Sequence, residues 1–223
     1  MATNTKDYGI IGKKIGMTQV FDDEGNVCPV TIIQLAENII TDIKTEARDG
    51  YNAIQVGAFK AKEKHITKAD KNRFEKNGVE LFRKTKEFRC HEAIEDVKVG
   101  DQINYEDFFK DLEKVNVTGT SIGKGFQGGV KLHNMSVGRR SHGSKSKRQI
   151  GSIGAGTDPS RVMKGKRMPA MMGNKTVTQM KAKVFKYDAE KNVVLIKGAV
   201  PGKARNTLLI QASGSRTWNN YNK

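Results

Sequence analysis

The chain has 223 residues and a formal net charge of +16, with 36% hydrophobic residues and a mean hydropathy of −0.60. No run approaches the roughly 18 apolar residues of a membrane span, and the N-terminal residues show no apolar signal-peptide core. We therefore expect no membrane partner, and an acidic partner that is nucleic acid rather than lipid. Cys28 and Cys90 lie far apart and lack metal-ligand spacing, so we expect neither a disulfide nor a zinc site.

Short β-rich runs open the chain. Residues 15–21 and 27–35 flank the turn sequence DDEGN, which predicts a hairpin. A second turn signal, ARDG, precedes residues 52–59, which we interpret as a third strand. The N-terminal part is therefore expected to begin a β structure.

The pattern changes after residue 60. Up to residue 95 the sequence is highly charged with helical spacing. Thr67 and Asp70 form a possible capping pair, and Gly78 is a helix stop signal. We expect a small, partly helical insert here.

Strand signals then return in five places. They occur at residues 100–103, 115–122, 176–187, 193–197 and 207–211. Many short strands with Gly turns predict a closed or nearly closed barrel. Because the strands on both sides of the basic region must pair within one body, that region has to leave the barrel and return.

The basic region carries most of the charge. Residues 117–183 hold 14 Lys and Arg, 12 Gly, one acid (Asp158) and one aromatic residue (Phe126), a formal +13. Self-repulsion makes such a one-sided stretch tolerable only beside a polyanion. It also has too few large apolar side chains to offset the entropy of folding alone, so we expect a partner to order it.

These signals predict a mainly β protein with a small α insert, in which a β-barrel body carries a long basic extension loop. The expected organisation is a first barrel part at 1–59, a charged and partly helical insert at 60–97, barrel strands at 98–122, the basic Gly-rich extension at 123–173, barrel strands at 174–212, and a C-terminal tail at 213–223.

Two motifs in the basic region resemble enzyme signatures. Residues 123–128 match GxGxxG, but no helix pattern follows and no acid lies about twenty residues on to hold a ribose, so we exclude a dinucleotide site. His133 and His142 suggest a nuclease, yet no nearby carboxylate orients either ring, and phosphate or base-edge hydrogen bonding explains them more simply. An RNA-modifying or RNA-cleaving enzyme on a barrel scaffold stays open as the alternative, as does a free-standing regulator of messenger RNA.

The densest basic run is RRSHGSKSKR, residues 139–148, which we interpret as a phosphate-binding segment. The scarcity of aromatic residues disfavours a single-strand reader, which needs stacking platforms. Five methionines are expected to pack where the extension rejoins the body: Met163, Met168, Met171, Met172 and Met180.

Four segments resemble signatures of the ribosomal protein L3 family of the large subunit, in its bacterial and plastid form. They are GKKIGMTQVF (12–21), VTGTSIGKGFQGGVKLHNM (117–135), RSHGSKSKRQIGSIGAGTDPSRVMKGKRMPAMMG (140–173) and VLIKGAVPGK (194–203). The resemblance spans nearly the whole chain.

The resemblance implies a structural constituent of the large ribosomal subunit with a translation-protein-like barrel. It implies direct, early binding of large-subunit ribosomal RNA near its 3′ end, and an extension that reaches toward the peptidyl transferase centre. It further implies contact with neighbouring ribosomal proteins, a ribosome in bacterial cytoplasm or plastid stroma, and no catalytic residue, cofactor, metal or small-molecule substrate. The residues expected to bind RNA are Lys124, Lys131, His133, Arg139, Arg140, His142, Lys145, Lys147, Arg148, Arg161, Lys164, Lys166, Arg167 and Lys175.

The chain departs from the family pattern in two places. Many bacterial members carry a glutamine that is a methylation target after GSIG, whereas this chain has Ala155, so that modification is not expected. The tail at 213–223, which contains Trp218, matches no family signature.

Overall fold

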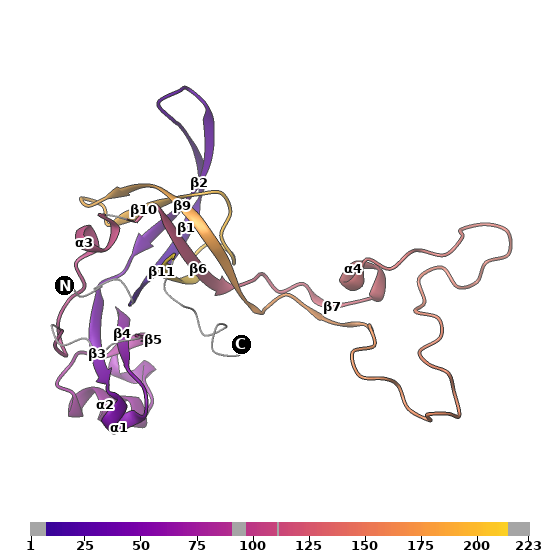
Figure 1. Cartoon of the computed structure of the whole chain (residues 1–223), viewed down its shortest axis with the longest axis horizontal. Coiled ribbons are helices and arrows are strands. Elements are labelled where there is room, and N and C mark those ends of the chain that lie inside the picture. The colour runs from indigo at the N-terminus through magenta and orange to yellow at the C-terminus, as the bar shows by residue number, and fades with distance from the viewer. Residues whose placement is uncertain (1–7, 91–96, 111, 214–223) are drawn as a thin grey trace. The chain divides into compact units, whose positions relative to one another are not determined.

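The computed structural model describes residues 8–90, 97–110 and 112–213. The chain divides into two compact units, which we call the body (1–120 with 176–223) and the basic unit (121–175). The protein is mainly β, as the sequence predicts (Figure 1). No helix among the described residues is long and apolar enough to cross a membrane. Apart from residue 213, the expected tail lies outside the described residues.

The elements of the body, in chain order, are β1 (Gly9–Phe21), β2 (Val27–Leu35), β3 (Asn38–Lys44), α1 (Glu46–Asp49), β4 (Ala53–Lys60), a 3-10 turn (Glu63–His65), α2 (Lys68–Lys76), β5 (Phe82–Arg89), α3 (Tyr105–Phe109), β6 (Lys114–Thr120), β9 (Thr176–Asp188), β10 (Val193–Lys197) and β11 (Thr207–Ala212). Those of the basic unit are β7 (Gly125–Gln127), α4 (Gly129–His133) and β8 (Ala170–Met172).

Six antiparallel strands form a closed barrel in the order β1, β11, β6, β9, β10, β2. Side chains alternate between the two faces of a strand, and β11 shows this directly, because Leu208 and Ile210 are fully buried between partly exposed neighbours. Val115 and Val117 of β6 contribute equally buried side chains. The short apolar strands that the sequence indicates therefore line the barrel interior.

A separate three-stranded sheet, in the order β3, β4, β5, replaces part of the predicted barrel. The assignment of residues 1–59 to the barrel is wrong beyond β2, because β4 pairs with β3 and β5 and with no barrel strand. Residues 100–103 form no strand either, since Gln102 makes only an isolated bridge with Ile39. Strand partners are non-local, so composition alone does not reveal which sheet a strand joins.

The charged insert is only partly helical. Thr67 caps α2 as predicted, and its hydroxyl accepts the Asp70 N–H at 3.3 Å. However, β5 lies in the segment interpreted as helical. Phe82 and Phe88 are its two buried side chains, and charged residues cover most of its other positions. This composition is typical of an edge strand with one buried face.

Asn38 joins the three-stranded sheet to the barrel. Its buried side chain accepts the Ile11 N–H at 2.8 Å and donates to the Ile11 carbonyl at 3.0 Å. Its backbone N–H donates to the Tyr105 hydroxyl at 2.9 Å, and that hydroxyl donates to the Ala36 carbonyl. Buried residues of both sheets belong to one hydrophobic core, so the body is stabilised as one unit.

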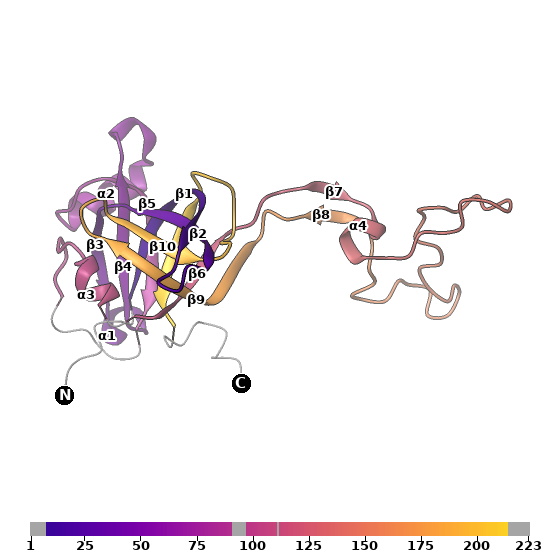
Figure 2. The same ribbon diagram turned by 90° about the horizontal axis from the view of Figure 1, so that it is seen from above.

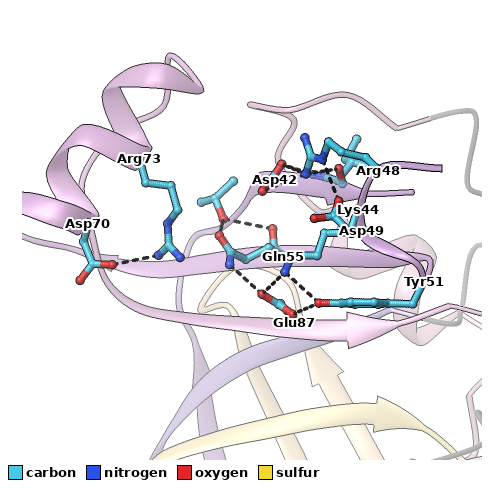
Figure 3. A network of polar contacts seen from close by, with 11 residues as sticks. Asp42, Lys44, Arg48, Asp49, Tyr51, Gln55, Asp70, Arg73 and Glu87 are labelled. Atoms are coloured by element: carbon cyan, nitrogen blue, oxygen red, sulfur yellow. Dashed lines mark hydrogen bonds and ion pairs between the residues drawn. The ribbon is translucent and has the colours of Figure 1, made fainter. Parts of the chain in front are cut away.

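A polar network covers the opposite end of the three-stranded sheet (Figure 3). Glu87 accepts hydrogen bonds from Tyr51 at 3.1 Å and Gln55 at 3.2 Å, and pairs with Lys44 at 3.1 Å. Burial alone raises the pKa of Glu87, but the hydrogen bonds from Lys44 and Tyr51 outweigh it, so this pKa lies below its ordinary value. The carboxylate therefore stays ionised and is neutralised within the body.

Lys14 anchors the loop that connects β10 and β11. Its ammonium group is largely buried and donates to the carbonyls of Val200 at 3.0 Å and Gly202 at 2.9 Å. In the same loop, the Asn206 amide donates to the Thr120 carbonyl at 3.0 Å, at the last residue of β6. A chain of hydrogen bonds thus fixes the end of β6, where the basic unit begins.

A short two-stranded ladder closes the root of the basic unit, and β7 and β8 lie side by side in it (Figure 2). The Ser121 N–H donates to the Lys175 carbonyl and the Lys124 N–H to the Met172 carbonyl, both at 2.9 Å. Gly173 has a φ of +74°, and a Cβ there would lie 2.1 Å from the Ile122 carbonyl oxygen. Only glycine fits this crossing of two backbones.

We predict that Lys14→Met destabilises the body by about 1–3 kcal/mol, because two carbonyls lose a charged donor. Urea unfolding followed by circular dichroism measures the change. Lys13→Met is the matched control, since Lys13 is the adjacent, partly exposed residue. Equal stability of the two variants would show that the loop anchor contributes nothing.

We predict that Gly173→Ala opens the root of the basic unit. Left-handed strain of about 1–2 kcal/mol adds to the backbone clash, so amide exchange at Ser121 and Lys124 should accelerate about tenfold or more. Hydrogen exchange resolved by NMR is the measurement. Gly128→Ala, whose added methyl group meets no atom within 4 Å, should leave the rates unchanged. Equal rates in both variants would contradict the close-crossing account.

Candidate nucleic-acid interface

The basic unit exposes every one of its cations. Its twelve Lys and Arg side chains are all classed as exposed, against one acid, Asp158. They are Lys124, Lys131, Arg139, Arg140, Lys145, Lys147, Arg148, Arg161, Lys164, Lys166, Arg167 and Lys175. All twelve are among the residues predicted from sequence to bind RNA.

The two units treat their cations differently. In the body, Lys44 pairs with Glu87, Lys60 with Glu37 and Glu80, and Lys71 with Glu63 and Glu75. Within the described residues, no cation of the basic unit makes an ion pair with a carboxylate. The cations of such a surface repel one another, and the surface attracts polyanions.

Backbone contacts gather the densest basic run into a closed loop. The Gly138 N–H donates to the Lys147 carbonyl at 2.9 Å, and this hydrogen bond closes the residues between them into a loop. His142 and Gly143 both have positive φ, of +56° and +73°, and reverse the chain at its tip. A Cβ on Gly138 would lie 2.3 Å from the Ser146 carbonyl oxygen, which makes this close approach specific to glycine. Arg139, Arg140, Lys145 and Lys147 are thereby held on one short loop.

The other predicted cations lie outside this loop, and Arg148 directly follows it. Lys124 and Lys175 flank the ladder at the root, and Lys131 lies on α4. A second basic stretch, residues 161–167, contains a turn in which the Lys166 N–H donates to the Met163 carbonyl at 3.3 Å. The structure therefore distributes the predicted residues along the basic unit and brings only those of the 138–147 loop into one cluster.

The two predicted histidines have different surroundings. A ring nitrogen of His133, Nε2, lies 2.9 Å from the Met168 carbonyl oxygen, which links α4 to the segment before β8. His142 is exposed at the loop tip. Nowhere in the described chain do three or more His, Cys, Asp or Glu gather in a metal-binding group. A carbonyl partner positions His133 but provides no carboxylate for acid–base catalysis.

The expectation that no helix follows the GxGxxG segment is wrong. Helix α4 begins at Gly129, directly after Gly128, and the strand β7 lies inside the motif. The helix has only five residues, and the acid that would hold a ribose is missing from the sequence at the required distance. The motif serves the ladder with β8 instead, where Gly125 has a φ of +68°.

The methionines do not pack as expected. Met163, Met171 and Met180 are 59–65% exposed, so the expectation that all five pack where the extension rejoins the body is wrong. Across the ladder, Met171 pairs with Phe126, whose side chain is 68% exposed. Sequence reasoning missed this exposed apolar pair because its members come from opposite ends of the basic unit.

The body also carries a cationic depression that sequence reasoning missed. A cavity of about 300 Å³ is lined by Lys84 and Lys86 of β5, by Arg205, and by Thr120 and Thr176 at the strand ends. The alternation Lys-Thr-Lys along β5 is the sequence signal, since it places both lysines on the same face of a strand. The charged composition of this segment predicts a helical insert instead, which hides the alternation.

Known proteins are similar to this chain over most of its length. A family model described as Ribosomal protein L3 matches residues 60–193. Large ribosomal subunit protein uL3c of Nicotiana tabacum is 47% identical over 203 residues, which cover 91% of this chain and 78% of that protein. Large ribosomal subunit protein uL3 of Alkaliphilus metalliredigens is 46% identical over 205 residues, or 92% and 97% of the two chains, and that of Prochlorococcus marinus is 47% identical over 195 residues, or 87% and 89%. The chain belongs to the ribosomal protein L3 family.

Proposed function

We propose that this chain is a structural protein of the large ribosomal subunit that binds its ribosomal RNA directly through the basic unit. The observation that carries the proposal is the set of twelve exposed cations that no carboxylate of the described chain neutralises. Phosphate groups supply the missing counter-charge, and release of their counterions drives binding. In the body, in contrast, Lys44, Lys60 and Lys71 have acidic partners.

The composition of the basic unit also specifies how it binds. A single aromatic residue, Phe126, gives no series of stacking platforms for successive unpaired bases. Cations and close-lying backbone suit phosphates of folded RNA, whose helices are recognised largely by shape and backbone. The 138–147 loop offers the densest group of such contacts. All fourteen residues predicted from sequence, the two histidines included, belong to this proposed surface.

The family supports the finer parts of the proposal. The body acts as a translation-protein-like barrel at the subunit surface, and the basic extension, residues 123–173, enters the RNA toward the peptidyl transferase centre. An extension that RNA encloses must be present before the RNA closes around it, which favours binding early in assembly. The relatives named uL3c and uL3 favour a ribosome of the plastid stroma or the bacterial cytoplasm.

We predict that alanine at Arg139, Arg140, Lys145, Lys147 and Arg148 together flattens the salt dependence of RNA binding. Each phosphate contact contributes about 0.9 to the steepness of log affinity against log salt on duplex nucleic acid, so losing five contacts should reduce that steepness by up to about 4.5. Filter binding of the full chain to large-subunit RNA, over a series of salt concentrations, measures it. The barrel should remain folded, because these residues lie outside the body.

The matched control removes five exposed cations from the body, namely Lys62, Lys64, Lys68, Lys76 and Arg83. It changes the net charge by the same amount and should leave most of the slope intact. Equal slopes for the two variants would mean that binding follows total charge rather than the basic unit. A slope in the first variant that equals that of the unmodified chain would refute the phosphate-binding role.

A further inference from the structure

The hairpin formed by β1 and β2 has the opposite charge pattern from the basic unit. Between Lys14 and Lys44 the sequence contains no Lys or Arg, although the whole chain has 40 of them. The turn of the hairpin carries three consecutive acids, Asp22, Asp23 and Glu24. A surface of this charge is repelled by phosphates, so this hairpin is unsuited to the partner of the basic unit.

The outer part of this hairpin extends beyond the barrel. Pairing of β1 with β11 ends at Lys13, and pairing of β2 with β10 ends at Val30. In the strand ladders, residues 19–21 and 27–29 therefore pair only with each other, and Figure 1 shows this ribbon, in indigo, projecting from the barrel. An isolated two-stranded ribbon has only marginal stability in water. Apolar side chains on such a ribbon therefore suggest that another surface covers them.

One face of the ribbon carries uncovered apolar side chains. Phe21 pairs with Val27, Gln19 with Pro29, and Met17 lies two residues further along the same face. Phe21, Val27 and Met17 are 66%, 55% and 51% exposed. We call these three side chains with Pro29 the hairpin patch. Exposed apolar side chains that adjoin one another on a strand pair mark an interaction surface more often than isolated ones do.

The acidic turn is ordered by its own hydrogen bonds. The Asp22 carboxylate accepts the N–H groups of Asn26 at 2.8 Å and Glu24 at 3.2 Å, and Gly25 supplies the left-handed residue with a φ of +80°. The Asn26 N–H is the main cause that lowers the pKa of Asp22, so its charge persists well below neutral pH. Asp23 and Glu24 are thus presented by a preformed turn, which reduces the entropy lost on binding.

We propose that the hairpin patch and the acidic turn dock onto a neighbouring protein of the large subunit, at an apolar site bordered by Lys and Arg. This inference rests on the proposed function, because it requires the chain to be inside the particle. Charge selects the partner: a protein surface with a cationic border attracts the turn, whereas RNA repels it. The hairpin patch then supplies the apolar contact that excludes water.

Photocross-linking of assembled particles tests the proposal. The full chain is made with Phe21→p-benzoylphenylalanine or, as the comparison probe, with Ile153→p-benzoylphenylalanine in the basic unit, where Ile153 is 44% exposed. Large subunits are purified in high salt, irradiated and digested, and the products are identified by mass spectrometry. We expect the Phe21 probe to link to a protein segment that contains Lys or Arg, and the Ile153 probe to link to ribosomal RNA.

A charge reversal gives the second measurement. Asp23→Lys with Glu24→Lys should lower the protein cross-link from the Phe21 probe about tenfold, since attraction at the border becomes repulsion. Asp22 is kept because it holds the turn together. Glu46→Lys with Glu190→Lys, both exposed elsewhere on the body, makes the same change in net charge and should leave the yield unchanged.

The outcomes separate the two proposals. If the Ile153 probe links to RNA while the Phe21 probe links to RNA or to nothing, the docking inference is overturned and the proposed function stands. An undiminished protein cross-link after the charge reversal overturns the cationic border. Absence of the unmodified chain from large subunits overturns the proposed function, and the docking inference falls with it.

Discussion

Antiparallel pairing of β6 with β9 is the constraint on which the rest of the structure depends. The last residues of this ladder, Thr120 and Thr176, lie directly opposite each other, and the whole basic unit is the chain between them. Both strands are also needed to close the barrel. Asn206 belongs to the loop that Lys14 anchors, and its hydrogen bond to the Thr120 carbonyl holds the end of β6 from outside the ladder. Folding of the body therefore determines where the basic unit starts and ends.

Charge is distributed unevenly among the parts of this protein. In the three-stranded sheet, Lys44 is neutralised by Glu87. The basic unit leaves its cations without carboxylate partners among the described residues, and the hairpin of β1 and β2 has no cation after Lys14. As a member of the L3 family the chain is a ribosomal protein and not an enzyme. The charges of its surfaces therefore act on binding and not on a chemical reaction.

The sequence predicts the parts of this structure that local pattern determines. The strands at 193–197 and 207–211 alternate clearly and were located almost to the residue, and the cap at Thr67 follows from its spacing to Asp70. β3 was missed because only two residues, Ala36 and Glu37, separate it from β2. β5 was missed because an edge strand buries few side chains, and its charges resemble a helical insert. Which sheet β4 joins depends on contacts with residues distant in sequence, which no local pattern contains.

In the candidate interface, too, local features are predictable from the sequence and contacts between distant residues are not. Its cations could be identified from composition, because charge needs no knowledge of the fold. The loop closed between Gly138 and Lys147, the carbonyl partner of His133 and the exposed pair of Phe126 with Met171 could not, since each joins separated positions.

The direct pairing of Thr120 with Thr176 also has a consequence for how such a protein can vary. Two residues that face each other in an antiparallel ladder are the positions that a tight reverse turn ordinarily connects. The basic unit thus occupies the place of a hairpin loop, and its length does not enter the register of any barrel strand. Insertions or deletions within it would change the length of the basic unit while the barrel stays the same. That length is a property that this fold leaves free to evolve.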